Sequence, residues 1–170
     1  MINFIVRTII YLIFIILQFV LPKYMPFDTW IIYPNFILMF ILYTALNKGI
    51  MEGQITGFVY GLTWDILSTN IFGVRALSFT IVGYLFGFFN KKLNKKQPIT
   101  QISLIAVGLV ITQLVMYIVY MITYSTDDIF VQKFELSFSI LANVFVNLLL
   151  TPIIFKIFLF IEERIHRCKI

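Results

Sequence analysis

Two residues of opposite charge lie within an otherwise apolar part of the chain and are the first candidates for chemistry. Asp65 and Arg75 flank the turn-rich segment 68–73. A carboxylate at the centre of a bilayer costs roughly 2.5–3.5 kcal/mol on insertion scales, so it must be paired, hydrated or near the interface. We expect a structural ion pair between Asp65 and Arg75 that closes this hairpin. A partner contact or a ligand pocket at the outer face is the alternative.

Glycine recurs at every fourth position in the segment that leads to Asp65. Four residues advance a helix by about 400°, so these glycines form one slowly rotating stripe along which another backbone can approach closely. Asp65 continues this stripe, and a shorter pair repeats the spacing later in the chain. The predicted helix-packing or partner-binding glycines are Gly49, Gly53, Gly57, Gly61, Gly83 and Gly87. The helix that they receive belongs either to this chain or to a partner.

Amide and hydroxyl side chains interrupt the other apolar runs. Three of them recur at intervals of four in the last run and must face neighbouring helices, where side-chain hydrogen bonds contribute roughly 0.6 kcal/mol on average. The proline that follows them should kink the helix. The predicted polar core consists of Asn35, Gln113, Asn143, Asn147, Thr151 and Pro152.

Side chains that catalyse reactions are scarce. The chain has one histidine, His166, and one cysteine, Cys168, both in its basic last segment. No base–nucleophile pair, carboxylate pair or metal-ligand spacing is visible in the sequence. The sequence therefore predicts that the protein is not an enzyme and uses no cofactor or metal.

The elements that position these residues are predicted from composition. Of the 170 residues 61% are hydrophobic and only 12% are charged, whereas soluble domains carry about 25% charged residues. Six spans of roughly 20 residues would use about 120 positions and leave no room for a soluble module. We expect an all-α integral membrane protein, a single polytopic domain over 1–170. Its bundle of about six transmembrane helices is predicted at 4–22, 31–47, 54–67, 74–90, 99–124 and 134–161.

Basic residues predict the orientation of these spans. With six spans, the lysine cluster of 91–96 and the basic residues of 164–169 fall on one side together with Arg7 and Lys48. This is the positive-inside pattern, so both termini are expected in the cytoplasm. The net charge of +5 suits anionic lipid headgroups. Membrane lipids are therefore expected partners, and nucleic acid is not.

The order of several motifs resembles a known family. Pro34-Asn35 precedes Gly57-Phe58-x-x-Gly61-x-x-x-Asp65-x-x-Ser68, which is followed by Gly73-x-Arg75-x-Leu77, Tyr84 and later Asn147-x-x-x-x-Pro152. Over residues 34–152 this pattern resembles the rod shape-determining membrane proteins of the MreD family. The block from Gly57 to Leu77 is the most specific part of the resemblance.

The resemblance implies a non-enzymatic scaffold subunit of the bacterial cell-elongation (rod) complex in the cytoplasmic (inner) membrane. Its implied partner is the single-span scaffold MreC, through which it helps to couple cytoplasmic MreB filaments to the peptidoglycan synthases and to cell shape. The family also implies a fold similar to the substrate-binding subunits of energy-coupling-factor vitamin transporters.

Two other functions fit parts of the sequence. A small-molecule (vitamin) binding subunit of an energy-coupling-factor type transporter agrees in size and number of spans. Such a site needs several convergent polar and aromatic groups, and the predicted outer loops are short and offer few. A membrane hydrolase is the third interpretation, but it requires a base–nucleophile pair that the sequence does not show.

Overall fold

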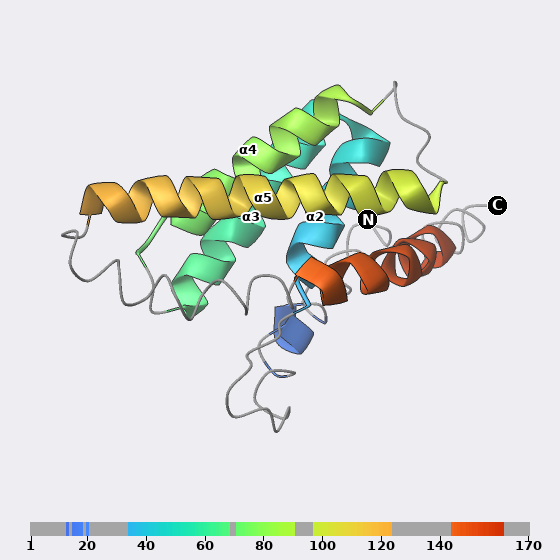
Figure 1. The fold of residues 1–170 in the computed structure, drawn as a ribbon, viewed down its shortest axis with the longest axis horizontal. Coiled ribbons are helices and arrows are strands. Elements are labelled where there is room, and N and C mark those ends of the chain that lie inside the picture. Colours follow the sequence, from blue (N-terminus) through green and yellow to red (C-terminus); the bar gives the residue numbers. More distant parts are fainter. Residues whose placement is uncertain are drawn as a thin grey trace, which may run out of the picture.

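The structure is a computed structural model, and it describes residues 13, 15–18, 20, 34–68, 71–90, 97–123 and 144–161. These residues form helices and short turns, with no strand among them, so the all-α prediction is confirmed for this part of the chain. The labelled helices in Figure 1 are α2 (Phe36–Lys48), α3 (Ile50–Leu67), α4 (Val74–Phe88) and α5 (Pro98–Thr123). A further helix covers Val144–Ile161, and residues 13, 15–18 and 20 are also helical.

The helix bounds follow from residues that begin and end helices. The side chain of Asn35 caps α2 by accepting the backbone N–H of Leu38 at 3.1 Å, as expected for an N-cap amide. Gly49 ends α2 and directly precedes α3. Its φ of +97° is allowed because glycine adopts this conformation without steric cost. For this reason α3 begins at residue 50, earlier than the predicted start at 54. Parts of the predicted spans 4–22, 31–47 and 134–161 lie outside the described residues.

Helix α2 is the centre of the core. Eleven of its 13 residues are buried, and a helix that is apolar all round requires neighbours on every side. Helices α3, α4 and α5 all contact it. The helix Val144–Ile161 adds aromatic contacts, in which the ring of Phe40 lies 5.3 Å from that of Phe158 and the ring of Tyr43 lies 5.7 Å from that of Phe155. The core is therefore assembled around α2 from elements distant in sequence.

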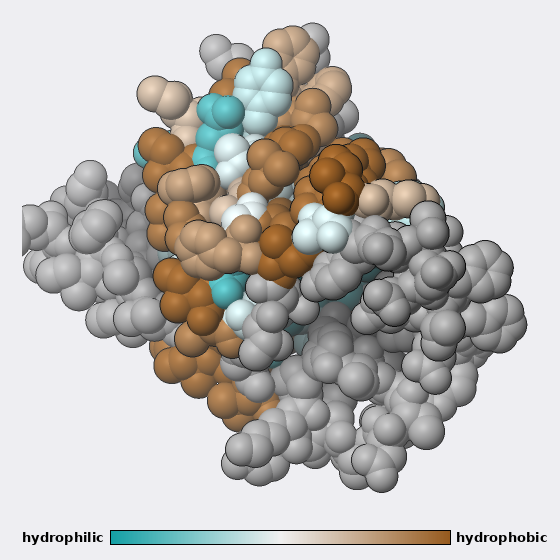
Figure 2. Space-filling model, turned by 90° about the vertical axis from the view of Figure 1, so that its left-hand side faces the viewer, coloured by the Kyte–Doolittle hydropathy of each residue, from teal (hydrophilic) through white to brown (hydrophobic). Residues whose placement is uncertain are grey.

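Helices α3 and α4 form an antiparallel pair, and α5 contacts α4 and α2 and runs along the longest dimension of the molecule (Figure 1). Among the described residues, two helices, α5 and Val144–Ile161, are long and apolar enough to cross a membrane, while α2 and α4 are shorter apolar helices. Among the described residues at the end of the molecule that lies at the left of Figure 1, most side chains that Figure 2 shows are hydrophobic. The bundle of six membrane spans stays a prediction.

Candidate functional site

The glycine stripe of α3 lies against the backbone of α4. Glycines at three successive positions of the stripe, together with Asp65, are the only residues of α3 that are buried. A methyl group added at Gly53 would come within 2.6 Å of the carbonyl oxygen of Gly83, and one added at Gly57 would overlap the carbonyl of Phe79. At Gly61 it would come within 2.7 Å of the carbonyl oxygen of Arg75. The stripe therefore receives a helix of the same chain.

The glycines of α4 complete this contact from the other side. A methyl group added at Gly83 would overlap the carbonyl of Gly53, and one added at Gly87 would come within 2.5 Å of the Cα atom of Ile50. Gly49 adjoins the same contact, since a methyl group there would lie 3.1 Å from the side-chain nitrogen of Asn90. All six glycines that the sequence singled out thus lie along one interface, which we call the α3–α4 seam. Small residues on both helices permit this close approach.

Asp65 closes the seam at the end opposite Gly49. Its side chain is only 3% exposed. Its carboxylate accepts three backbone N–H groups at the start of α4, from Gly73 at 3.0 Å, Arg75 at 3.2 Å and Ala76 at 3.0 Å. Gly73, the residue that precedes α4, supplies no side-chain cap. Asp65 therefore caps α4 from the neighbouring helix and satisfies N–H groups that have no partner within α4.

Arg75 contributes its backbone N–H to this cap, and its side chain contacts a ring of α3. The carbon atom of its guanidinium group lies 5.1 Å from the centre of the Trp64 ring, a distance typical of a cation–π contact. The contact between Asp65 and Arg75 runs from the backbone N–H of Arg75 to a carboxylate oxygen. The pairing of their side-chain charges stays a prediction.

Buried amides hold the beginning of α2. The side-chain oxygen of Asn147, which is 1% exposed, accepts the backbone N–H of Asn35 at 2.6 Å. The side-chain oxygen of Gln18 accepts the backbone N–H of Phe36 at 2.8 Å. Thr151 is buried and donates its hydroxyl to the carbonyl of Asn147 at 2.6 Å. The backbone N–H groups of Asn35 and Phe36 are thus bonded to side chains from both ends of the chain. We call this arrangement the α2 clasp.

Not every residue of the predicted polar core belongs to it. Gln113 is exposed on α5, which corrects its assignment to the core. The reason is helical geometry, since the adjacent Thr112 is buried and one residue turns the helix by about 100°. Pro152 is half-buried and lies inside the helix Val144–Ile161, and the predicted kink there stays a prediction. Asn143 lies outside the described residues.

Sequence reasoning missed two buried glutamines. Gln18 and Gln101 are 3% and 5% exposed, yet both lie in runs that were assigned to spans on hydropathy alone. The available signal was the rarity of amides in such runs, because a polar side chain inside a membrane span usually faces protein.

The chemistry of these sites is structural. The side chains of Asp65, Asn147 and Gln18 accept hydrogen bonds from backbone N–H groups. Within the described ranges no three His, Cys, Asp or Glu side chains lie close enough together to hold a metal ion. The arrangement can fix helix ends and close a helix pair.

Comparison with known proteins identifies a family. A family model described as rod shape-determining protein MreD matches residues 2–161. No solved structure matches the chain.

Proposed function

The chain belongs to the MreD family of rod shape-determining proteins, and from this premise we propose that it is a non-enzymatic membrane scaffold of the rod complex. Family membership places it in a bacterial membrane and gives it a role in cell shape. The finer proposal is that it binds an MreC-like single-span scaffold. Through that partner it helps to couple MreB filaments in the cytoplasm to peptidoglycan synthases outside.

The family match over residues 2–161 carries this proposal, and the use of the polar side chains supports it. A scaffold must hold its helices in one arrangement, which requires fixed helix ends and close contacts. The α3–α4 seam and the α2 clasp provide both, with Asp65 and Asn147 bonded to backbone groups. A protein that presents a stable membrane surface to others needs no more chemistry than this.

The proposed partner is received outside the α3–α4 seam, because α4 already fills that groove. Part of the remaining surface of α3 is apolar and exposed, as Phe58 and Ile66 illustrate. We propose a six-span arrangement with both termini in the cytoplasm, in which such faces meet lipid or partner helices. The predicted cytoplasmic loops then lie on the side of the MreB filaments.

Mild-detergent extraction from the native membrane tests the proposal. A tagged copy at its natural abundance should retain a single-span, coiled-coil membrane protein after purification, identified by mass spectrometry. A tagged multi-span protein of unrelated family at equal abundance is the control, and it should not retain that partner. Recovery of a tightly bound vitamin without any such partner would contradict the scaffold and favour the transporter subunit.

A further inference from the structure

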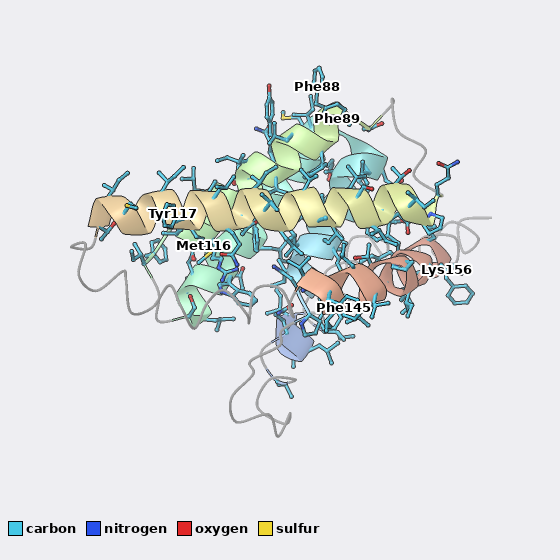
Figure 3. All side chains as sticks on the ribbon, in the orientation of Figure 1. Phe88, Phe89, Met116, Tyr117, Phe145 and Lys156 are labelled. Atoms are coloured by element: carbon cyan, nitrogen blue, oxygen red, sulfur yellow. The ribbon has the colours of Figure 1, made fainter. Side chains whose placement is uncertain are left out.

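Helix α5 has two sides of different character. One side faces the core and buries Gln101, Leu104, Ile105, Gly108 and Thr112. The opposite side is turned away from α2 and α4, the two helices that α5 contacts. It displays residues at intervals of four and three, which we call the α5 stripe: Ile99, Ser103, Ala106, Val110, Gln113 and Tyr117. All of them are exposed except Ala106, which is half-buried, and Figure 3 labels Tyr117 on this helix.

The spacing of the stripe is that of a coiled-coil seam. Alternating intervals of four and three residues keep one face of a helix against a parallel partner helix. The half of the stripe near the start of α5 contains the small residues Ser103 and Ala106, and small side chains allow close approach of helices in lipid. A lipid-facing surface has no requirement for small or polar residues at these positions.

Gln113 is the residue that a lipid-facing stripe cannot explain. It lies ten residues before Thr123 and fifteen after Pro98, so its Cα atom is about 15 Å from the nearer helix end at 1.5 Å per residue. The side chain is exposed, and no described residue provides it with a hydrogen-bond partner. A carboxamide left without a partner in hydrocarbon costs several kcal/mol. The surface that covers Gln113 must therefore supply both a donor and an acceptor at this depth.

We propose that the α5 stripe docks on the same stripe of a second copy of this chain. Two copies inserted in one orientation are related by a two-fold axis along the membrane normal, so their α5 helices run parallel. Each residue near that axis then meets its own equivalent at the same depth. A carboxamide is both donor and acceptor, so two Gln113 side chains satisfy each other with two reciprocal hydrogen bonds. The inference rests on the proposed crossing of the membrane by α5, and it does not depend on MreC binding.

Cysteine cross-linking in reconstituted vesicles tests this dimer. The background is Cys168→Ser, which removes the single cysteine of the chain. Val110→Cys places a thiol on the stripe, and Ile118→Cys places one about a quarter of a turn away. The two native side chains are equally exposed, at 56% and 55%, so lipid access is matched. An oxidant should link Val110→Cys into a dimer at least several-fold more efficiently than Ile118→Cys. Equal linking at both sites, or none at Val110→Cys, would overturn the proposal.

Substitution of Gln113 tests whether the dimer depends on hydrogen bonds between the two carboxamides or only on packing of the two helices. In the Val110→Cys background, Gln113→Leu should lower the dimer association constant about tenfold, as expected for loss of two interhelical hydrogen bonds. Gln113→Asn keeps a carboxamide and should retain part of the association. Folding should survive both changes because the side chain is exposed, and membrane abundance checks this. Unchanged dimerisation in Gln113→Leu would refute the amide contact. Because purified vesicles contain no partner protein, the result is independent of the proposed scaffold role.

Discussion

Asp65 shows how one carboxylate performs a task that a local capping residue usually performs. Gly73 has no side chain with which to cap α4, and Asp65 supplies the acceptor from the neighbouring helix through three backbone N–H groups. The capped helix end also favours a negative charge. Closure of the hairpin and capping of α4 are therefore the same interaction.

Removal of this carboxylate should destabilise the hairpin. We expect Asp65→Ala to lower the free energy of unfolding by about 2–4 kcal/mol, because a cap is lost and buried N–H groups are left without acceptors. Asp65→Asn keeps one acceptor oxygen and should lose less. Thermal unfolding in detergent measures both variants.

The charge exchange Asp65→Arg with Arg75→Asp distinguishes capping from ion pairing. Asp65 accepts hydrogen bonds from backbone N–H groups, and these groups are present whichever side chain stands at position 75. A carboxylate at position 75 should therefore not restore stability. Restoration of membrane abundance by the double exchange would show that the side-chain ion pair dominates instead.

Two glycines provide a matched pair for testing the seam. A methyl group at Gly57 would overlap the carbonyl of Phe79, whereas one at Gly108 would lie 3.5 Å from a Leu42 methyl carbon, an ordinary contact. Gly57→Ala should destabilise the protein by about 1–3 kcal/mol through overpacking, and Gly108→Ala should be close to neutral. Equal melting temperatures for the two variants would show that α3 and α4 are not in close contact.

At the scale of elements, the α2 clasp explains how a helix surrounded by apolar side chains keeps its first N–H groups bonded. Asn147 and Gln18 come from segments far from α2 in the sequence, and each accepts one of these groups. A buried N–H group without an acceptor is costly. The clasp therefore links the start of α2 to two other helical segments.

Loss of one residue of the α2 clasp should destabilise the whole bundle. Asn147→Ala is expected to lower the free energy of unfolding by about 1–3 kcal/mol, since the N–H of Asn35 loses its acceptor. Leu149→Ala is the control, because Leu149 is 59% exposed and its truncation should change stability much less. Unfolding of both variants in the same detergent gives the comparison. A larger loss for Leu149→Ala would argue against the clasp.

The apolar runs predicted from hydropathy overlap α2, α3, α4 and α5, and local signals bound some of these helices. Asn35 before α2 and Gly49 after it are such signals. The glycine interval of four correctly indicated a close helix contact, but spacing alone could not identify α4 as the neighbour. The roles of Gln113 and Asp65 needed three-dimensional information. Which side of α5 meets the core, and which groups a carboxylate reaches, depend on how distant elements pack.

At the scale of the molecule, the distribution of basic residues predicts the orientation in the membrane. Reporter fusions after residue 95 and at the C-terminus should both be cytoplasmic, and a fusion at Asp127 should be external, because basic loops remain inside. Growth of cells that carry each fusion is compared with growth of cells that carry the untagged chain, which controls for damage by the fusions. An external signal at the lysine cluster would refute the six-span arrangement.

Rescue of cell shape tests the central claim most directly. In rod-shaped bacteria depleted of their own MreD-family protein, the ratio of cell length to width is measured after expression of this chain. We expect the unmodified chain and Gly108→Ala to restore rods, and Gly57→Ala to leave wide or round cells with little protein in the membrane. Round cells despite normal membrane abundance of the unmodified chain, in the strain from which it comes, would contradict its role as a scaffold of the rod complex.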